Sequence, residues 1–234
     1  MRVLVIPDIH GEDHWKQFIN LVIGENPSVD KAVFLGDYLD SYTIDNGDML
    51  RNFAELLKLK KENPGKVTLL YGNHEYSYVD EKYRCSGFRA ELAFDLQKML
   101  SENKGILQNA YQIENIVFTH AGIENSWFTA IFKGLTDRNV ADQLNNPCDR
   151  TQLSALHHVG WIRGGINHVG GIFWCDRREL TEPLKGYIQV VGHTPVPKIQ
   201  RYEWEDSSVF FTDTYQTVVE PYIFDTEIKD FVKN

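Results

Sequence analysis

The chain has 234 residues with a formal net charge of −9, and 42% of its residues are hydrophobic. These values are typical of a globular protein that buries a sizeable core, and the acidic balance argues against a general polyanion-binding surface, which requires clustered Lys and Arg. Three widely spaced cysteines without a Cys-x-x-Cys pair, no signal-peptide pattern and no apolar run of membrane-spanning length predict a cytoplasmic protein with no disulfides and no membrane association.

Short apolar strands alternate with amphipathic helices in the first half of the chain. Strands are expected at residues 3–6, 31–35 and 67–71, and helices at 13–22, 48–62 and 88–100. In the first of these helices, Trp15, Phe18, Ile19 and Val22 recur at the spacing of one buried helical face. The alternation predicts an α/β fold with a β-α-β unit at its start.

The second half of the chain has a different pattern. A hairpin is expected at residues 110–119 and a strand at 188–191, and residues 209–211 and 218–224 are expected to form a β-meander that completes a second sheet. Between about 124 and 180 the sequence shows short amphipathic pieces and many glycines, but no alternating strand pattern. We therefore expect a single domain over residues 1–234, with a helical, glycine-rich insertion at 124–180 over the active site.

Polar side chains follow the predicted strands at five strand ends. They are Asp8 with His10, Asp37 with Asp40, Asn73 with His74, His120, and His193. Open α/β sheets bind their ligands at the carboxyl ends of strands. A side-chain period of two would place Asp8 and His10 on one side, and the two oxygens of Asp37 can bridge two cations. Oxygen and nitrogen ligands without thiolate fit a catalytic metal site, so the sequence predicts a dinuclear metal-dependent phosphoesterase.

These residues belong to five ordered motifs. The motifs are Asp8-Ile9-His10-Gly11, Gly36-Asp37-Tyr38-Leu39-Asp40, Gly72-Asn73-His74-Glu75, His120-Ala121-Gly122 and Gly192-His193-Thr194. Their order and spacing resemble those of the calcineurin-like metallophosphoesterases, and most of all the phosphoprotein (serine/threonine) phosphatase branch with its bacterial and phage members. The resemblance spans residues 8–194 and implies a four-layer α/β/β/α metallophosphoesterase sandwich with the metal centre between its two sheets.

The resemblance also implies roles for individual residues. Asp8, His10 and Asp37 would hold a first divalent metal ion, and Asp37, Asn73, His120 and His193 a second. Manganese is the expected metal, with iron, zinc or nickel as alternatives. His74 resembles the family's catalytic imidazole, which protonates the leaving oxygen, and Asp40 would orient it; the alternative is that Asp40 only caps a turn. Asn73 is also expected to contact the substrate.

Two positions depart from the family patterns. Pro195 stands where many metallophosphoesterases have a further metal-binding histidine, and Ser41 stands where the phosphoprotein phosphatase branch has a phosphate-binding arginine. The insertion offers Arg163 and Arg177 as replacements, because a guanidinium binds phosphate oxygens bidentately. The alternative for each is a solvated surface arginine.

The expected reaction is hydrolysis of phosphomonoesters by a metal-bridging hydroxide, with serine/threonine phosphoprotein phosphatase activity as the default. The substrate would be a phosphoprotein, a nucleotide or a nucleic-acid end. One alternative is a dinucleoside polyphosphate hydrolase, an RNA or DNA end phosphatase, or a phosphodiesterase. Another is a catalytically silent binding scaffold. No extended nucleic-acid groove is expected.

Overall fold

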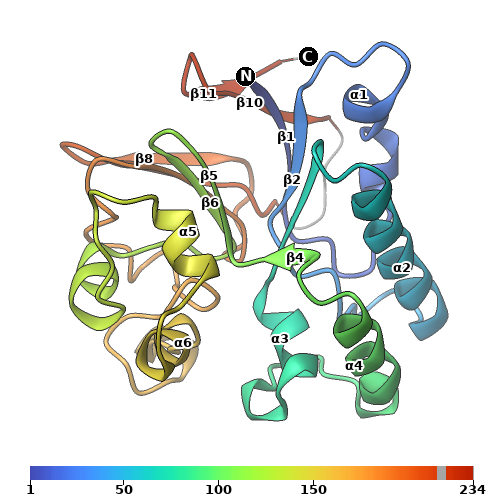
Figure 1. Ribbon diagram of the computed structural model, residues 1–234, viewed down its shortest axis with the longest axis horizontal. Coiled ribbons are helices and arrows are strands. Elements are labelled where there is room, and N and C mark those ends of the chain that lie inside the picture. Colours follow the sequence, from blue (N-terminus) through green and yellow to red (C-terminus); the bar gives the residue numbers. More distant parts are fainter. Residues whose placement is uncertain (215–219, 234) are drawn as a thin grey trace. The chain divides into compact units, whose positions relative to one another are not determined.

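The computed structural model describes residues 1–214 and 220–233, and the chain forms two compact units. The first comprises Met1–Gln108 and Gln216–Asn234, and the second comprises Asn109–Tyr215 (Figure 1). Each unit has its own sheet and helices, which confirms the predicted mixed α/β class. Among the described residues, none of the helices combines the length and the apolar character needed to cross a bilayer.

The sheet of the first unit brings its strand ends to one edge. Its strands, in spatial order, are β11 (Asp230–Val232), β10 (Tyr222–Asp225), β1 (Arg2–Ile6), β2 (Lys31–Phe34), β3 (Val67–Leu70) and β4 (Leu107–Gln108). Strands β1 to β4 are parallel, with Ile6 opposite Phe34 and Phe34 opposite Leu69. The segments that follow β1, β2 and β3 therefore begin side by side.

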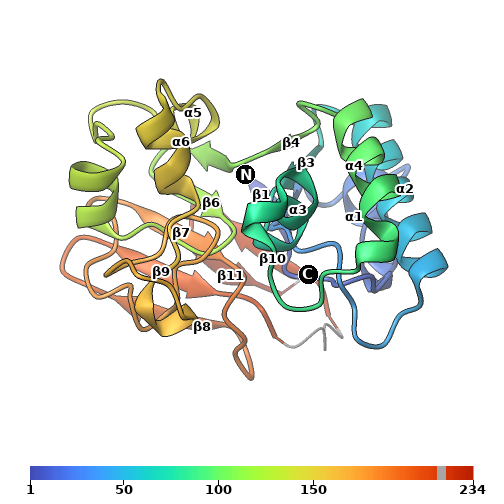
Figure 2. The ribbon, with the colours of Figure 1, turned by 90° about the horizontal axis from the view of Figure 1, so that it is seen from below.

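Helices cover one face of this sheet and bury its side chains. The helices of this unit are α1 (Asn20–Ile23), α2 (Asn46–Glu62), α3 (Asn73–Val79) and α4 (Ala93–Glu102), with 3₁₀ turns at His14–Gln17, Glu81–Tyr83 and Ala90–Leu92. Helices α1, α2 and α4 lie on the same side of the sheet in both ribbon views (Figures 1 and 2). Leu4 and Phe34 of the sheet share one buried apolar cluster with Phe53 of α2 and Leu96 of α4, which stabilises the unit by the hydrophobic effect.

The helix predictions for this unit were partly wrong. Helix α2 matches the helix expected at residues 48–62. Asp45 caps it by accepting a hydrogen bond from the amide of Asp48 at 3.0 Å. The helix expected at 13–22 is instead a 3₁₀ turn followed by the short α1, because a tertiary bond from the Trp15 indole to Asn52 (3.0 Å) fixes that segment. The helix expected at 88–100 begins only at Ala93, and α3 was not predicted.

The second unit contains a five-stranded sheet. Its order is β5 (Ala110–Ile113), β6 (Ile116–Thr119), β7 (Ile188–Val191), β9 (Ser208–Phe211) and β8 (Gln200–Glu203). The predicted hairpin is β5–β6, and β6, β7 and β9 run parallel. Strand β8 was missed because it is an exposed, polar edge strand without a hydrophobic pattern.

The segment between β6 and β7 is helical, as predicted for residues 124–180. It contains a π-helical turn (Trp127–Ile131), α5 (Val140–Asn145), α6 (Arg150–Leu156) and a 3₁₀ turn (Trp161–Arg163), and isolated β-bridges pair Glu124 with Pro183 and Gly160 with Asn167. Both helices lie on one side of their sheet in Figures 1 and 2. The single-domain organisation and the four-layer stacking stay predictions.

The predicted C-terminal meander was wrong. Strand β9 does join the second sheet, but β10 pairs antiparallel with β1 in the first sheet, with Arg2 opposite Asp225. The open edge of β1 offers unpaired backbone groups, and β10 satisfies them instead of folding back on β9. Residues 218 and 219 of the predicted strand lie outside the described residues.

Candidate metal centre

Two glycines let the ends of β2 and β3 approach closely. Gly36 has φ +103°, and a Cβ there would lie 2.5 Å from the backbone nitrogen of Gly72. A Cβ on Gly72 would lie 2.1 Å from Oδ1 of Asp37. Because neither position has a side chain, that oxygen accepts a 3.0 Å hydrogen bond from the amide of His74. The two motifs are thus joined around the carboxylate of Asp37.

Two imidazoles face the second oxygen of Asp37. Nε2 of His10 and Nε2 of His74 each lie 3.9 Å from Oδ2 of Asp37. Nδ1 of His10 lies 2.8 Å from the carbonyl oxygen of Leu39. A carbonyl only accepts, so Nδ1 donates this hydrogen bond, and Nε2 is the nitrogen that faces Asp37 and could bind a metal ion.

Asp8 and Asn73 stand at the same edge. Both are buried: Asp8 follows β1, and Asn73 is the first residue of α3. The alternation argument for Asp8 and His10 was wrong, because β1 ends at Ile6 and His10 has φ +41°. The turn after the strand, rather than the strand's pleat, places His10.

His74 is held from its other nitrogen by Asp40. Nδ1 of His74 lies 2.9 Å from Oδ2 of Asp40, whose side chain is fully buried. Burial opposes a charge on His74, but the carboxylates of Asp37 and Asp40 outweigh it and raise the pKa of His74 well above its ordinary value. The pair has the geometry of an imidazolium acid oriented by a carboxylate. A turn cap alone would not require this burial.

Glu75 was quoted in a motif but given no role. Its carboxylate accepts hydrogen bonds from the amides of Asp37 (2.9 Å), Tyr38 (2.8 Å) and Gly72 (2.9 Å). Burial and the nearby Asp37 raise the pKa of Glu75 to about 7, against the opposing effect of these donors. Glu75 therefore ties the ends of β2 and β3 together beneath Asp37. Only its place in the Gly-Asn-His-Glu motif could have indicated this.

The second unit brings two further imidazoles together. His120 follows β6 and His193 follows β7, and Nε2 of His120 lies 3.0 Å from Nδ1 of His193. Two nitrogens that each lie about 2.1 Å from one cation, at about a right angle, are about 3.0 Å apart. The observed separation therefore fits a pair of ligands on one metal ion.

The insertion arginines differ in their placement within this unit. The guanidinium of Arg163 lies 3.2 Å from Oγ1 of Thr194, next to His193, and its Nε lies 3.0 Å from Asp176. The guanidinium of Arg177 instead donates a 2.7 Å hydrogen bond to the side-chain oxygen of Gln200 in β8. The placement favours Arg163, because its guanidinium lies next to the candidate ligand His193.

Backbone strain gathers at the candidate residues. Seven described residues other than glycine have a positive φ, and four of them are His10, Asp37, Asp40 and His193. Such conformations cost free energy and recur at functional sites, where the surrounding fold imposes them. No sequence pattern predicted these positive φ angles.

The donor set fits divalent metal ions. In the first unit, His10, Asp37 and His74 place ligand atoms within 4.8 Å of one another, and Asp8 and Asn73 add oxygen donors at the same sheet edge. The second unit holds a separate pair of nitrogen donors, His120 and His193. Carboxylate, amide and imidazole ligands without thiolate suit manganese, iron, nickel or zinc.

The fold and the site together define an α/β protein with candidate metal ligands at the carboxyl ends of its strands. The family model described as calcineurin-like phosphoesterase matches residues 1–216. This chain belongs to that family.

Curated relatives include serine/threonine-protein phosphatases. A protein described as a probable serine/threonine-protein phosphatase of Encephalitozoon cuniculi is 38% identical over 52% of this chain and 26% of its own length. A serine/threonine-protein phosphatase of Saccharomyces cerevisiae is 36% identical over 35% of this chain and 25% of its own length. The match thus spans about a quarter of these relatives. Their names agree with the predicted phosphoprotein phosphatase branch.

Solved structures share the fold. A cold-active protein-tyrosine phosphatase of a Shewanella species has a TM-score of 0.59 at 18% identity, over 96% of this chain and 75% of that one. A protein serine/threonine phosphatase of Saccharomyces cerevisiae has a TM-score of 0.53 at 17% identity, over 91% of this chain and 67% of that one. These likenesses establish the two-sheet α/β fold of the chain.

Proposed function

We propose that this protein is a dinuclear metal-dependent phosphatase that hydrolyses phosphomonoesters, with phosphoserine and phosphothreonine side chains as its substrate class. The observation that carries the proposal is the His74 imidazole, with Nδ1 held by Asp40 and Nε2 3.9 Å from Asp37. A proton donor beside a candidate metal-binding carboxylate is an arrangement that can assist phosphate-ester cleavage by protonating the leaving oxygen.

The ligand assignment follows the family motifs. The first cation would take Asp8, His10 and Asp37, and the second would take Asp37 and Asn73 together with His120 and His193. That donors from both units serve one centre rests on family membership. When bound, two divalent cations neutralise phosphoryl charge and lower the pKa of water. Manganese is the proposed metal, since hard oxygen donors predominate in the first unit.

The chain's own residues would bind phosphate and move one proton. Protonated His74 gives its Nε2 proton to the leaving oxygen, and Asp40 keeps the ring in place through Nδ1. Arg163 would bind phosphate oxygens from its place beside His193 and Thr194, and Asn73 would contribute its amide. Arg177 would contact the substrate less directly, because Gln200 and Tyr202 engage its guanidinium.

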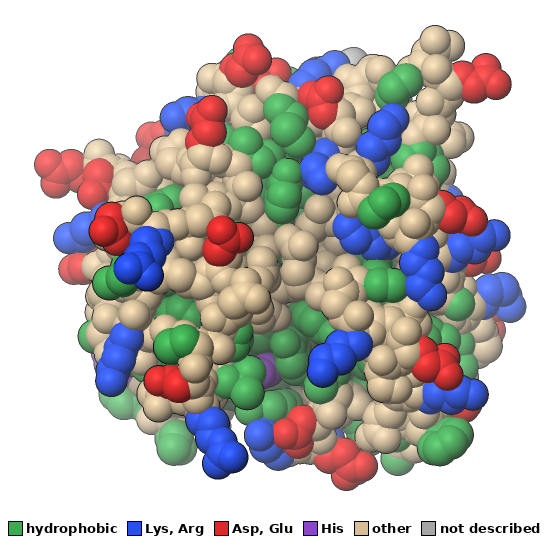
Figure 3. Space-filling view, in the orientation of Figure 1, with side chains coloured by type: hydrophobic (Ala, Val, Ile, Leu, Met, Phe, Trp, Pro, Cys, Tyr) green, Lys and Arg blue, Asp and Glu red, His purple; other side chains and the backbone are tan. Residues whose placement is uncertain are grey.

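The charge distribution bears on the substrate class. On the face shown in Figure 3, Lys and Arg side chains are interspersed with Asp and Glu among the coloured residues. An isolated phosphate on a protein side chain needs no long basic stripe. That the molecule has no extended nucleic-acid groove stays a prediction, as does its cytoplasmic location.

The test compares p-nitrophenyl phosphate with bis-p-nitrophenyl phosphate, using protein stripped by a chelator and reloaded with manganese. We expect monoester preference, and then turnover of phosphoserine or phosphothreonine peptides ahead of nucleotides and RNA ends.

Two histidine variants test the metal site. His120→Ala should lose bound metal and activity. His168→Ala should retain both, because His168 is exposed and packs on Trp161 in the same unit. Diester preference would instead indicate a phosphodiesterase, and no turnover with metal bound would indicate a binding scaffold.

A further inference from the structure

Both oxygens of the Asp40 carboxylate are engaged. Oδ2 lies 2.9 Å from Nδ1 of His74, and Oδ1 accepts a short hydrogen bond from the hydroxyl of Tyr78 in α3. Asp40 has no exposed surface. A buried carboxylate is costly unless donors satisfy it, so Tyr78 and His74 together determine where this group points.

The Tyr78 hydroxyl is itself fixed in direction. Its oxygen accepts a 2.9 Å hydrogen bond from the backbone amide of Arg89, so its proton is directed to Asp40, which only accepts. The ring of Tyr78 is fully buried and stacks on Phe88 with the centroids 4.8 Å apart. The phenol is therefore a rigid donor behind the carboxylate.

We propose that Tyr78 is a positioning residue for the proton donor: it holds the Asp40 carboxylate so that Asp40 keeps His74 aligned with the leaving oxygen. This inference rests on the proposed phosphatase function. Nothing in the sequence patterns assigned Tyr78 a role. Its hydroxyl is linked to the His74 ring by two hydrogen bonds, to Oδ1 and then from Oδ2 of Asp40, and the leaving oxygen would lie beyond Nε2 of that ring.

An alternative partner for His74 makes this support necessary. Sγ of Cys85 lies 3.5 Å from Nδ1 of His74 and 3.0 Å from Oγ of Ser77. Without the Tyr78 hydroxyl, Asp40 loses one of its two donors, so only His74 orients its carboxylate, and the imidazole then has Cys85 as a competing contact. The ring would lose its alignment without losing its packing.

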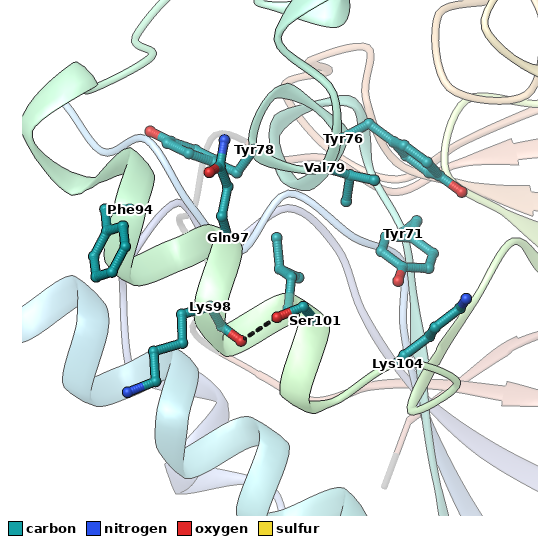
Figure 4. A pocket seen from close by; sticks show the side chains of 10 residues that line it. Tyr71, Tyr76, Tyr78, Val79, Phe94, Gln97, Lys98, Ser101 and Lys104 are labelled. Carbon is teal, nitrogen blue, oxygen red and sulfur yellow. Dashed lines mark hydrogen bonds between the residues drawn. The ribbon is translucent and has the colours of Figure 1, made fainter.

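A second tyrosine of the same helix provides the matched control. Figure 4 shows Tyr78 and Tyr76 leaving α3 in different directions around a pocket of about 800 Å³. The ring of Tyr76 lies against Tyr71, with the centroids 4.7 Å apart. Tyr76→Phe therefore removes a phenol hydroxyl from α3 without changing the donors of Asp40.

The experiment measures kcat and KM of manganese-loaded wild type, Tyr78→Phe and Tyr76→Phe with two substrates. Phenyl phosphate has a poor leaving group that needs a proton, and p-nitrophenyl phosphate has a good one that does not. For Tyr78→Phe we expect kcat on phenyl phosphate to fall about tenfold. This loss is smaller than the factor of about 10²–10⁴ that general acid catalysis contributes, because the acid is misaligned but still present. Its KM, its metal content and its p-nitrophenyl phosphate rate should stay within about twofold of wild type. Tyr76→Phe should match wild type on both substrates.

Equal losses on both substrates, or no loss, would overturn the positioning role while leaving the phosphatase assignment intact. If wild type turns over neither monoester, the proposed function itself fails. A double-mutant cycle adds a second criterion, because Tyr78→Phe should cost little more in an Asp40→Asn background if it acts through Asp40. Should Tyr78→Phe not fold, 3-fluorotyrosine placed at position 78 keeps the hydroxyl but makes it more acidic, at the cost of one small ring substituent. It should then change phenyl phosphate turnover alone, and an unchanged rate would count against the inference.

Discussion

Replacing Glu75 by Gln tests whether this carboxylate builds the site. The Glu75 carboxylate accepts hydrogen bonds from the backbone amides of Asp37, Tyr38 and Gly72. These bonds join the segment after β2 to the segment after β3. Gln keeps one acceptor oxygen and gains an NH2 group. At least one of the three amides then faces another donor inside the protein.

The expected cost follows from these contacts. Above the Glu75 pKa of about 7 the carboxylate is ionised. A hydrogen bond to a charged group then contributes about 1.5–3 kcal/mol, and a buried donor without an acceptor costs about 1–3 kcal/mol. Since the two contributions overlap, we expect Glu75→Gln to lower the free energy of unfolding by about 2–4 kcal/mol. The shifted Asp37 should also bind metal more weakly.

Urea unfolding of metal-free protein, prepared with a chelator, measures the change in the free energy of unfolding without the contribution of metal binding. Metal analysis after reloading measures the weaker binding of metal. Glu62→Gln is the control, because the exposed Glu62 pairs with Lys58 at 3.8 Å, an arrangement that contributes about 0.3–0.5 kcal/mol. A Glu75→Gln protein within about 1 kcal/mol of wild type that retains both metals would refute the reasoning.

Further substitutions separate the roles of the other residues. Asp37→Asn should abolish turnover and reduce bound metal below two ions per chain; unchanged stoichiometry would contradict its bridging role. His74→Ala should keep its metal but lose about 10²–10⁴-fold in kcat on phenyl phosphate, and wild-type behaviour there would exclude it as the acid. Asp40→Asn removes a carboxylate that raises the pKa of His74, so the ring should lose its proton at a lower pH, and the alkaline limb of the kcat profile should shift downward. Arg163→Ala should raise KM for monoesters more than Arg177→Ala does, and equal effects would contradict the placement seen here.

The sequence predicted the strand ends better than the elements between them. Apolar runs followed by polar candidate ligands identified all five strand ends, because burial of parallel strands leaves a strong local signal. The pairing of β10 with β1 joins segments more than 200 residues apart in the chain, and no local pattern encodes it. Strand β8, being polar and exposed, left no signal at all.

The site was predicted as residue types, but not as geometry. The motifs named Asp37, Asp40 and His74, yet the left-handed backbone at both aspartates arises from turns that many sequences adopt. The hydrogen bonds made by Glu75 and Tyr78 depend on α3, a helix that the sequence reasoning did not expect. Residues that support the reacting groups act through tertiary contacts, and those appear only in the folded chain.

The contact between His120 and His193 has a consequence for how the metal-free protein behaves. At 3.0 Å, one of the two nitrogens must carry the proton that the other accepts. The rings are thereby kept facing each other in the metal-free protein. A neutral imidazole keeps its single N–H on the nitrogen that does not bind a cation, so a metal ion bound by this pair would break the contact and shift the shared proton to the other nitrogen of its own ring, without net release of acid.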